Sequence, residues 1–382
     1  MDQKPPPEKK EEDDDDSIQR EVNWLQLPND VLSLISNKLI TIYDYIFFGA
    51  VCHPLHSIYK ENRLLIPRQL PFLMITTEFN LSDNQTRSLY SITDDYFFNF
   101  QLPVPQNKII VGSTYGWLVT TIRDNRDVSL FNPFLHFNNQ IDLPELPPND
   151  KFEAYQHCRV CKIVLSANPS STNNYVAVAI LGPPNFQLAF LKPGDKSWTC
   201  LPIHLIRDVI YFKDQFYAID SLSRLYICDL MDSVPKITNV EPPPYFCTVE
   251  LFLVESSGDL LKVCRLAKVT DDYELFVDYH KGGIRVIKLD PVTFEWIKVD
   301  DLQGRALFLG GNTSMSVLAS EFPGCIPNAV YITDDYYEKK EQDGLGPHDV
   351  SVFNLDDDTI DRYCLTETNM RIQPTIWIEP TL

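Results

Sequence analysis

The spacing of apolar residues changes from a helical period to a strand period near residue 70. After Leu27-Pro28-Asn29-Asp30, a stripe at i, i+1, i+4 and i+8 predicts a first helix through Val31, Leu32, Ile35 and Leu39. A second apolar pattern follows Thr41 and runs to Pro54, whose ring and missing N–H predict a break. A third, short helix is predicted over 55–59. Roughly forty helical residues are fewer than normally fold alone, so the segment either packs on the rest of the chain or offers an apolar surface to a partner.

From about Leu70 to the end, short runs rich in β-branched and aromatic residues alternate with turn residues. Typical predicted strands are 117–122, 175–181, 225–228 and 284–289. No long helical window interrupts them. The fold class is therefore mainly β, and the spacing fits a sandwich, a barrel or a propeller.

Two repeats favour the propeller. The string Ile/Val-Thr-Asp-Asp-Tyr occurs three times, at 92–96, 269–273 and 332–336. A strand, a proline corner and a return strand recur around Pro133, Pro193 and Pro291, which are 60 and 98 residues apart. Blade-sized periods over about 310 residues predict a β-propeller of six or seven blades. An aromatic residue that recurs in this unit is expected to pack between neighbouring blades.

The first twenty or so residues differ from both regions. They contain the run Glu11-Glu12-Asp13-Asp14-Asp15-Asp16, and like charges this dense repel one another. The expected organisation is a disordered acidic tail at 1–22, a helical domain at 23–66 and a β-propeller at 67–382. Over the whole chain, 33 Lys and Arg face 53 Asp and Glu, a net charge of −20. This charge disfavours nucleic acid and anionic membranes as partners.

The compartment follows from cysteines and targeting signals. The polar stretch Met1-Asp2-Gln3-Lys4-Pro5 lacks the apolar core of a signal peptide, and no run approaches the ~18 apolar residues of a membrane span. The nine cysteines are widely spaced and odd in number. We expect reduced thiols and a location in the cytoplasm, the nucleus or both.

Metal and redox chemistry find little support in the sequence. The pair Cys158 and Cys161, preceded by His157, lacks a second metal-binding pair and leads into a strand, so both are interpreted as strand cysteines. His53 and His56 lie three apart without a nearby carboxylate, which favours surface or interface histidines.

Catalytic motifs are not found either. The acidic clusters 271–272, 334–335 and 356–358 lack the register of a calcium loop and are expected to end strands and cap turns. The chain has no P-loop, nucleophile elbow, kinase signature or dinucleotide fingerprint, and its Lys and Arg do not cluster with aromatic residues. We therefore predict a binding protein with no catalytic residues, no cofactor and no metal.

The helical segment resembles an F-box, through Leu27-Pro28-Asn29-Asp30-Val31-Leu32 and its continuation to Leu39, then Asp44, Phe48 and Val51-Cys52. The remainder resembles the kelch-related β-propeller of a large plant F-box family related to the kinase-in-brassinosteroid-signalling proteins. The matching strings are Gly112-Ser113-Thr114-Tyr115-Gly116-Trp117, Gly304-Arg305-Ala306-Leu307-Phe308-Leu309-Gly310, Glu321-Phe322-Pro323-Gly324-Cys325 and Pro374-Thr375-Ile376-Trp377-Ile378.

The resemblance implies the substrate-recognition subunit of a Skp–cullin–F-box ubiquitin ligase. The F-box would dock a Skp-type adaptor, and through it a cullin, while the propeller would hold a client protein for ubiquitination. Some relatives bind protein kinases, so a kinase client is one expectation. By the motif, the adaptor surface or its immediate support consists of Leu27, Pro28, Val31, Leu32, Ile35, Leu39, Val51 and Cys52.

One departure from the F-box pattern keeps alternatives open. After Val51-Cys52 the usual Trp-Arg is replaced within His53-Pro54-Leu55-His56. Loss of the large tryptophan predicts a shifted third helix and a weaker adaptor contact. The first alternative is a propeller scaffold with a degenerate F-box and no ligase role. The second is a carbohydrate-binding or hydrolytic propeller.

Overall fold

The computed structural model describes the following residues: 27–39, 42–62, 69–75, 86–101, 108–122, 126–135, 138–148, 160–230, 232, 234–241, 248–266, 268–269, 277–278, 283–333, 349–364 and 375–380. The predicted acidic tail at 1–22 lies outside them. The chain divides into two compact units, Met1–Pro67 and Arg68–Leu382.

In its described residues, 27–39 and 42–62, the first unit contains three helices, α1 (Asn29–Ser36), α2 (Ile42–Val51) and α3 (His53–Asn62). Pro28 precedes α1, and its carbonyl accepts hydrogen bonds from the Val31 and Leu32 N–H groups. The predicted break near Pro54 is confirmed: α2 ends at Val51, and Pro54 lies in the first turn of α3. A proline fits there because the first turn of a helix needs no N–H donor. Leu39 lies in the turn after α1, which is shorter than predicted.

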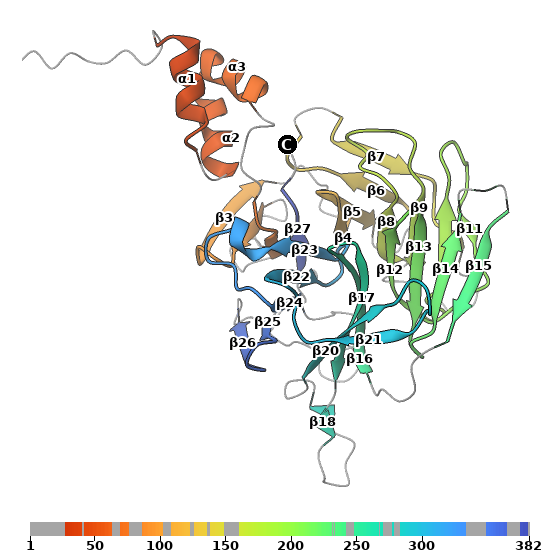
Figure 1. The fold of residues 1–382 in the computed structure, drawn as a ribbon. Helices are drawn as coiled ribbons and strands as arrows, with labels where there is room; N and C mark the ends of the chain where they lie inside the picture. Colours follow the sequence, from red (N-terminus) through yellow and green to blue (C-terminus); the bar gives the residue numbers. More distant parts are fainter. Residues whose placement is uncertain are drawn as a thin grey trace, which may run out of the picture. The chain divides into compact units, whose positions relative to one another are not determined.

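The second unit is a propeller of six blades, within the predicted six or seven (Figure 1). The first three blades are four-stranded antiparallel sheets, and their strands are named here from the centre outward. Blade 1 contains β27 (Ile376–Ile378), β1 (Phe72–Ile75), β2 (Thr86–Ser91) and β3 (Tyr96–Gln101). Blade 2 contains β4 (Lys108–Thr114), β5 (Trp117–Ile122), β6 (Val128–Phe131) and β7 (Gln140–Leu143). Blade 3 contains β8 (Val160–Leu165), β9 (Ala177–Leu181), β10 (Leu188–Leu191) and β11 (Thr199–Cys200).

The other three blades include one irregular sheet. Blade 4 contains β12 (Ile206–Phe212), β13 (Gln215–Asp220), β14 (Leu225–Asp229) and β15 (Lys236–Val240). Blade 5 contains β16 (Thr248–Ser256), β17 (Asp259–Leu266), β20 (Ile284–Leu289) and β21 (Trp296–Val299), with the short pair β18 (Lys268–Val269) and β19 (Val277–Asp278) between its second and third strands. Blade 6 contains β23 (Met315–Leu318), β22 (Arg305–Leu309), β24 (Ala329–Thr333), β25 (Asp349–Asn354) and β26 (Ile360–Cys364), and its β22–β24 pair is parallel. A 3₁₀ turn, Ala319–Glu321, follows β23.

The end of the chain closes the ring. Strand β27 pairs antiparallel with β1, which places Trp377 opposite Leu73 and makes the last strand the inner strand of blade 1. The buried Trp377 donates its indole N–H to the Leu309 carbonyl of blade 6 (3.2 Å), and its own carbonyl accepts a hydrogen bond from Ser113 Oγ of blade 2 (2.5 Å). One residue thereby joins three blades, and the core is continuous across the closure.

The proline-corner repeat corresponds to the outer hairpin of a blade. Pro133, Pro193 and Pro291 lie in the β6–β7, β10–β11 and β20–β21 connections. The buried Trp198, next to the second of these return strands, donates its indole N–H to the Pro144 carbonyl of blade 2 (2.8 Å). The predicted aromatic contact between neighbouring blades is therefore confirmed at Trp198.

A buried ion pair connects the inner strands of three blades. Lys162 Nζ on β8 lies 2.5 Å from Asp208 Oδ1 on β12, and both side chains are almost fully buried. The other carboxylate oxygen, Asp208 Oδ2, accepts a hydrogen bond from the Leu253 N–H on β16 (2.7 Å). Burial raises the pKa of the Asp208 carboxyl, while Lys162 and the backbone N–H donors oppose that rise.

Candidate functional site

The helical unit has a small core centred on the contact between α2 and α3. Gly49 on α2 has Tyr59 of α3 so close that an added Cβ would lie 2.6 Å from the ring. The Tyr45 hydroxyl donates to the Tyr59 carbonyl (2.9 Å), and burial raises the pKa of Tyr45 to about 12. Leu32 of α1 and Ile58 of α3 are also buried, at 2% and 1% exposure. Together these residues fix the three helices against one another.

The opposite side of α2 carries an exposed apolar stripe. Phe47, Ala50 and Val51 have the i, i+3, i+4 spacing that places side chains on one helix face, and all three are exposed. Phe47 is 66% exposed and Val51 71%. On α1, Leu34 is 64% exposed. A soluble surface usually scatters such residues singly, so an apolar stripe on so small a unit marks a candidate contact surface.

The predicted adaptor residues fall into three groups by exposure. Val51 is exposed on the stripe, and Pro28 is exposed at the start of α1. Leu32 is buried and supports the helix packing from within. The remaining five residues are half-buried: Leu27, Val31, Ile35, Leu39 and Cys52.

Phe47 and Leu34 are not among the site residues predicted from the sequence, although both are exposed. The sequence of α2, Ile42-Tyr43-Asp44-Tyr45-Ile46-Phe47-Phe48-Gly49-Ala50-Val51, is apolar on nearly every face. Periodicity therefore gives no signal for its outer face, and only the position of Gly49 against Tyr59 decides that Phe47 points away.

His56 of α3 lies at the contact between α2 and α3. Its ring stacks on Tyr59 at a centroid distance of 5.8 Å, and its Nδ1 lies 3.2 Å from the Gly49 carbonyl. Because a carbonyl only accepts, this nitrogen carries the proton. His53, by contrast, is exposed. The α3 helix is formed despite the departure from the F-box pattern, with Ile58 and Tyr59 buried.

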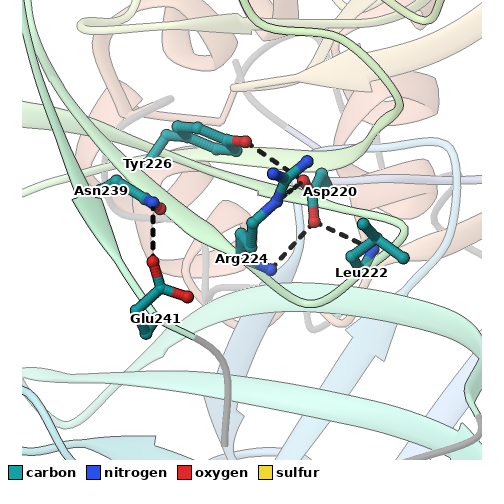
Figure 2. A network of polar contacts seen from close by, with 6 residues as sticks. All are labelled: Asp220, Leu222, Arg224, Tyr226, Asn239 and Glu241. Carbon is teal, nitrogen blue, oxygen red and sulfur yellow. Dashed lines mark hydrogen bonds and ion pairs between the residues drawn. The ribbon is translucent and has the colours of Figure 1, made fainter.

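A polar network in the propeller organises the β13–β14 turn. Figure 2 shows Asp220 at the end of β13, where it accepts hydrogen bonds from the Leu222 and Arg224 N–H groups, both at 2.9 Å. Its second oxygen accepts from Arg224 Nε (2.6 Å) and the Tyr226 hydroxyl (3.2 Å). With all its acceptor sites used, this buried carboxylate holds the β13–β14 turn in place.

The structure places some of the other residues that the sequence analysis singled out, the cysteine pair and the acidic clusters. Cys161 lies half-buried on β8, whereas His157 and Cys158 lie outside the described residues. Asp357 caps the β25–β26 turn by accepting from the Thr359 N–H and hydroxyl, which lowers the pKa of its carboxyl. The clusters at 271–272 and 334–335 lie outside the described residues. Within the described part of the chain, no group of His, Cys, Asp and Glu is placed to hold a metal, and no helix is long and apolar enough to cross a membrane.

Comparison with known proteins identifies the family. Residues 89–354 match the KIB1-4 beta-propeller model. The chain belongs to the KIB1-4 β-propeller family. It is 25% identical to the F-box protein SKIP23 of Arabidopsis thaliana, over 87% of this chain and 89% of that protein. It is also 27% identical to the putative Arabidopsis F-box protein At5g55150, over 72% and 75% of the two chains. The putative F-box/kelch-repeat protein At5g24040 is 24% identical over 82% and 87%. The predicted relationship to plant F-box proteins with a propeller domain is confirmed.

Proposed function

We propose that this KIB1-4 family protein is the substrate-recognition subunit of a Skp–cullin–F-box ubiquitin ligase. Its helical unit docks a Skp-type adaptor and through it a cullin, and its propeller holds a client protein, in the cytoplasm or the nucleus. The protein itself makes and breaks no bonds. The names of the relatives support an F-box role, and the helical unit supplies the contact surface.

The observation that carries the proposal is the exposed stripe of Phe47, Ala50 and Val51. Full burial of one large apolar side chain contributes about 1.5–3 kcal/mol. A few such anchors usually dominate a protein interface. Phe47 and Val51 thus act as anchors on the adaptor, while the buried Leu32 holds α1 within the helical unit.

The proposal is tested by co-elution of the full chain with a purified Skp-type adaptor at micromolar concentration. The wild type is expected to co-elute. The double substitution Phe47→Ser and Val51→Ser is expected to weaken the complex by about a hundredfold or more, since two anchors are lost. Leu222→Ser is the matched control, because Leu222 is similarly exposed (62%) but lies in the propeller.

Absence of a wild-type complex, or equal binding by the stripe variant, would contradict adaptor docking. The scaffold alternative predicts that outcome, and His53-Pro54-Leu55-His56 is the feature that favours it. In cells, a ligase receptor predicts that the stripe variant raises client abundance without changing client binding. A scaffold predicts unchanged abundance.

A further inference from the structure

Two hollows of the propeller share one wall, the β16–β17 turn. Ser257 and Gly258 both have positive φ angles (53° and 83°), as a tight two-residue hairpin requires, and the Gly258 N–H donates to Glu255 Oε1 (2.8 Å). On one side, Gly258 and Asp259 line a hollow of about 140 Å³ between blades 4 and 5. On the other, Ser257 and Asp259 line a hollow of about 250 Å³ that extends toward blade 6. The two hollows therefore lie next to each other, separated by the β16–β17 turn.

The smaller hollow is lined mainly by apolar side chains. Blade 4 contributes Phe212, Tyr217 and Ile227, and blade 5 contributes Leu260, Leu289 and Phe294. A volume of this size is comparable to one aliphatic or aromatic side chain of a partner. We call it the apolar hollow.

Apolar side chains at the border of the apolar hollow are exposed to solvent. Val292 is 84% exposed in the β20–β21 turn, and Phe294 is exposed there at a φ of +58°. Asp290 fixes this turn, because its carboxylate accepts from the Val292 and Thr293 N–H groups and its carbonyl accepts from the Phe294 N–H. A turn whose backbone is fixed this way loses little backbone freedom when a partner covers it, which favours binding.

The larger hollow carries an excess of negative charge. Among its lining residues, Asp259, Asp300 and Asp301 face only two cations, Lys288 and Lys298. Lys288 pairs with Asp259 at 3.0 Å, and Lys298 pairs with Asp300. Within the described part of the chain, the Asp301 carboxylate accepts a backbone N–H, that of Gln303 (2.6 Å), and pairs with no cation. We call it the acidic hollow.

We propose that the two hollows bind one segment of the client, with an apolar side chain in the apolar hollow and a nearby Lys or Arg in the acidic hollow. The charge of the occupant follows from complementarity with the acidic lining and with a chain of net charge −20. The shared Asp259 keeps the two positions within a few residues of each other along an extended segment. This inference rests on the client-binding part of the proposed function.

The experiment uses a phage-displayed library of random twelve-residue peptides, selected on the purified full chain. Enriched peptides are expected to carry Leu, Ile, Met or Phe within two to four positions of Lys or Arg. One enriched peptide is then synthesised with a fluorophore, and its affinity is measured by fluorescence polarisation. Replacement of its apolar residue by Ser, or of its basic residue by Gln, is expected to weaken binding.

Two variants of the protein locate the site. Phe294→Asn removes the apolar border while Asn tolerates the positive φ, and it is expected to weaken peptide binding by about tenfold. Asp300→Asn with Asp301→Asn keeps the shape, and it is expected to weaken binding by about threefold and to reduce its salt dependence. The controls are Leu222→Asn for exposed apolar area, and Asp358→Asn with Asp361→Asn for exposed carboxylates on blade 6.

The proposal is overturned if no peptide is enriched, if the enriched peptides lack the apolar–basic pair, or if the control variants weaken binding as much as the site variants. The assay contains no adaptor, so it is independent of the ligase role. Peptide binding without adaptor co-elution contradicts the ligase function alone. Adaptor co-elution without peptide binding contradicts this client site alone.

Discussion

The helical unit and the propeller distribute their apolar side chains differently. The propeller places its apolar strands between packed sheets, as in the cluster that joins Val164 of blade 3 to Val209 and Phe216 of blade 4. The helical unit buries one side of α2 at Tyr45 and leaves the other exposed at Phe47. A closed ring of sheets buries most of its own apolar surface, whereas three short helices lack a second layer to pack against. The difference indicates which unit depends on a partner for part of its burial.

The largest expected effect concerns the buried ion pair of Lys162 and Asp208 in the propeller. Asp208→Ala leaves Lys162 charged and buried and removes the acceptor of the Leu253 N–H. We expect a loss of about 3–5 kcal/mol in the free energy of unfolding, because a buried charge loses its partner. Denaturant unfolding followed by tryptophan fluorescence measures it, since Trp117, Trp198, Trp296 and Trp377 all lie in the propeller.

The double substitution Lys162→Met with Asp208→Leu is the control for that prediction. It removes both charges and is expected to recover most of the lost stability. If Asp208→Ala alone had no effect, the ion pair would not contribute to the joining of blades 3, 4 and 5.

The second prediction concerns the interior of the helical unit. Gly49→Ala places a methyl group against the Tyr59 ring. Overpacking costs about 1–3 kcal/mol, which outweighs the gain of about 1 kcal/mol in helix propensity. Hydrogen exchange read by mass spectrometry on peptides from 42–62 is expected to show faster exchange, with propeller peptides unchanged. Gly194→Ala is the contrasting variant, since its Cβ meets no atom within 4 Å but its φ is +85°.

The strands of the propeller could be predicted from the sequence only where their residues are mostly apolar. Strands β5 and β20 were predicted at their observed bounds because each is a run rich in β-branched residues between turns. Strands such as β15 were missed, since an outer strand with mostly exposed side chains lacks the apolar alternation. The parallel pairing of β22 with β24 was also unpredictable. Periodicity identifies strands, but it does not show that β23 lies on the inner edge of blade 6 and leaves β22 beside β24.

The candidate site was predictable only in part, for a related reason. On α1, the sequence mixes polar and apolar residues, so the period predicted the helix, and Leu32 of its apolar stripe faces inward. On α2, apolar residues occur on nearly every face, so the sequence does not indicate which face is exposed. The client hollows had no sequence signal, because blades 4 and 5 bring together residues far apart in the chain, such as Phe212 and Phe294.

The third prediction concerns a buried cation of the propeller, Lys262. Lys262 on β17 is fully buried, lies over the Trp296 ring at 4.4 Å and has no hydrogen-bond acceptor among the described residues. Burial lowers the pKa of its ammonium. We expect Lys262→Met, of similar length, to stabilise the propeller by about 1 kcal/mol near neutral pH. Denaturant unfolding of both proteins measures the difference.

The sign of its pH dependence distinguishes desolvation from other causes. Below the lowered pKa, the folded wild type must keep a charged ammonium buried, so the gain from Lys262→Met is largest there. As pH rises toward the ordinary lysine value, the folded wild type loses its proton before the unfolded chain does, and wild-type stability increases. The gain is therefore expected to shrink as the pH rises through the lowered pKa of Lys262 toward the ordinary lysine value. A gain independent of pH would assign the effect to packing.

The smallest expected effect on stability is the most informative about function. Phe47→Ser with Val51→Ser removes apolar area that already faces water, so the free energy of unfolding is expected to change by less than about 0.5 kcal/mol. Hydrogen exchange of peptides from 42–62 measures it in the same way as for Gly49→Ala. A large loss of protection would mean that the stripe stabilises the protein itself, and a loss of adaptor binding would then have a structural cause. Unchanged protection together with lost adaptor binding assigns the stripe to the partner, because only a contact made outside the folded chain can disappear without cost to that chain.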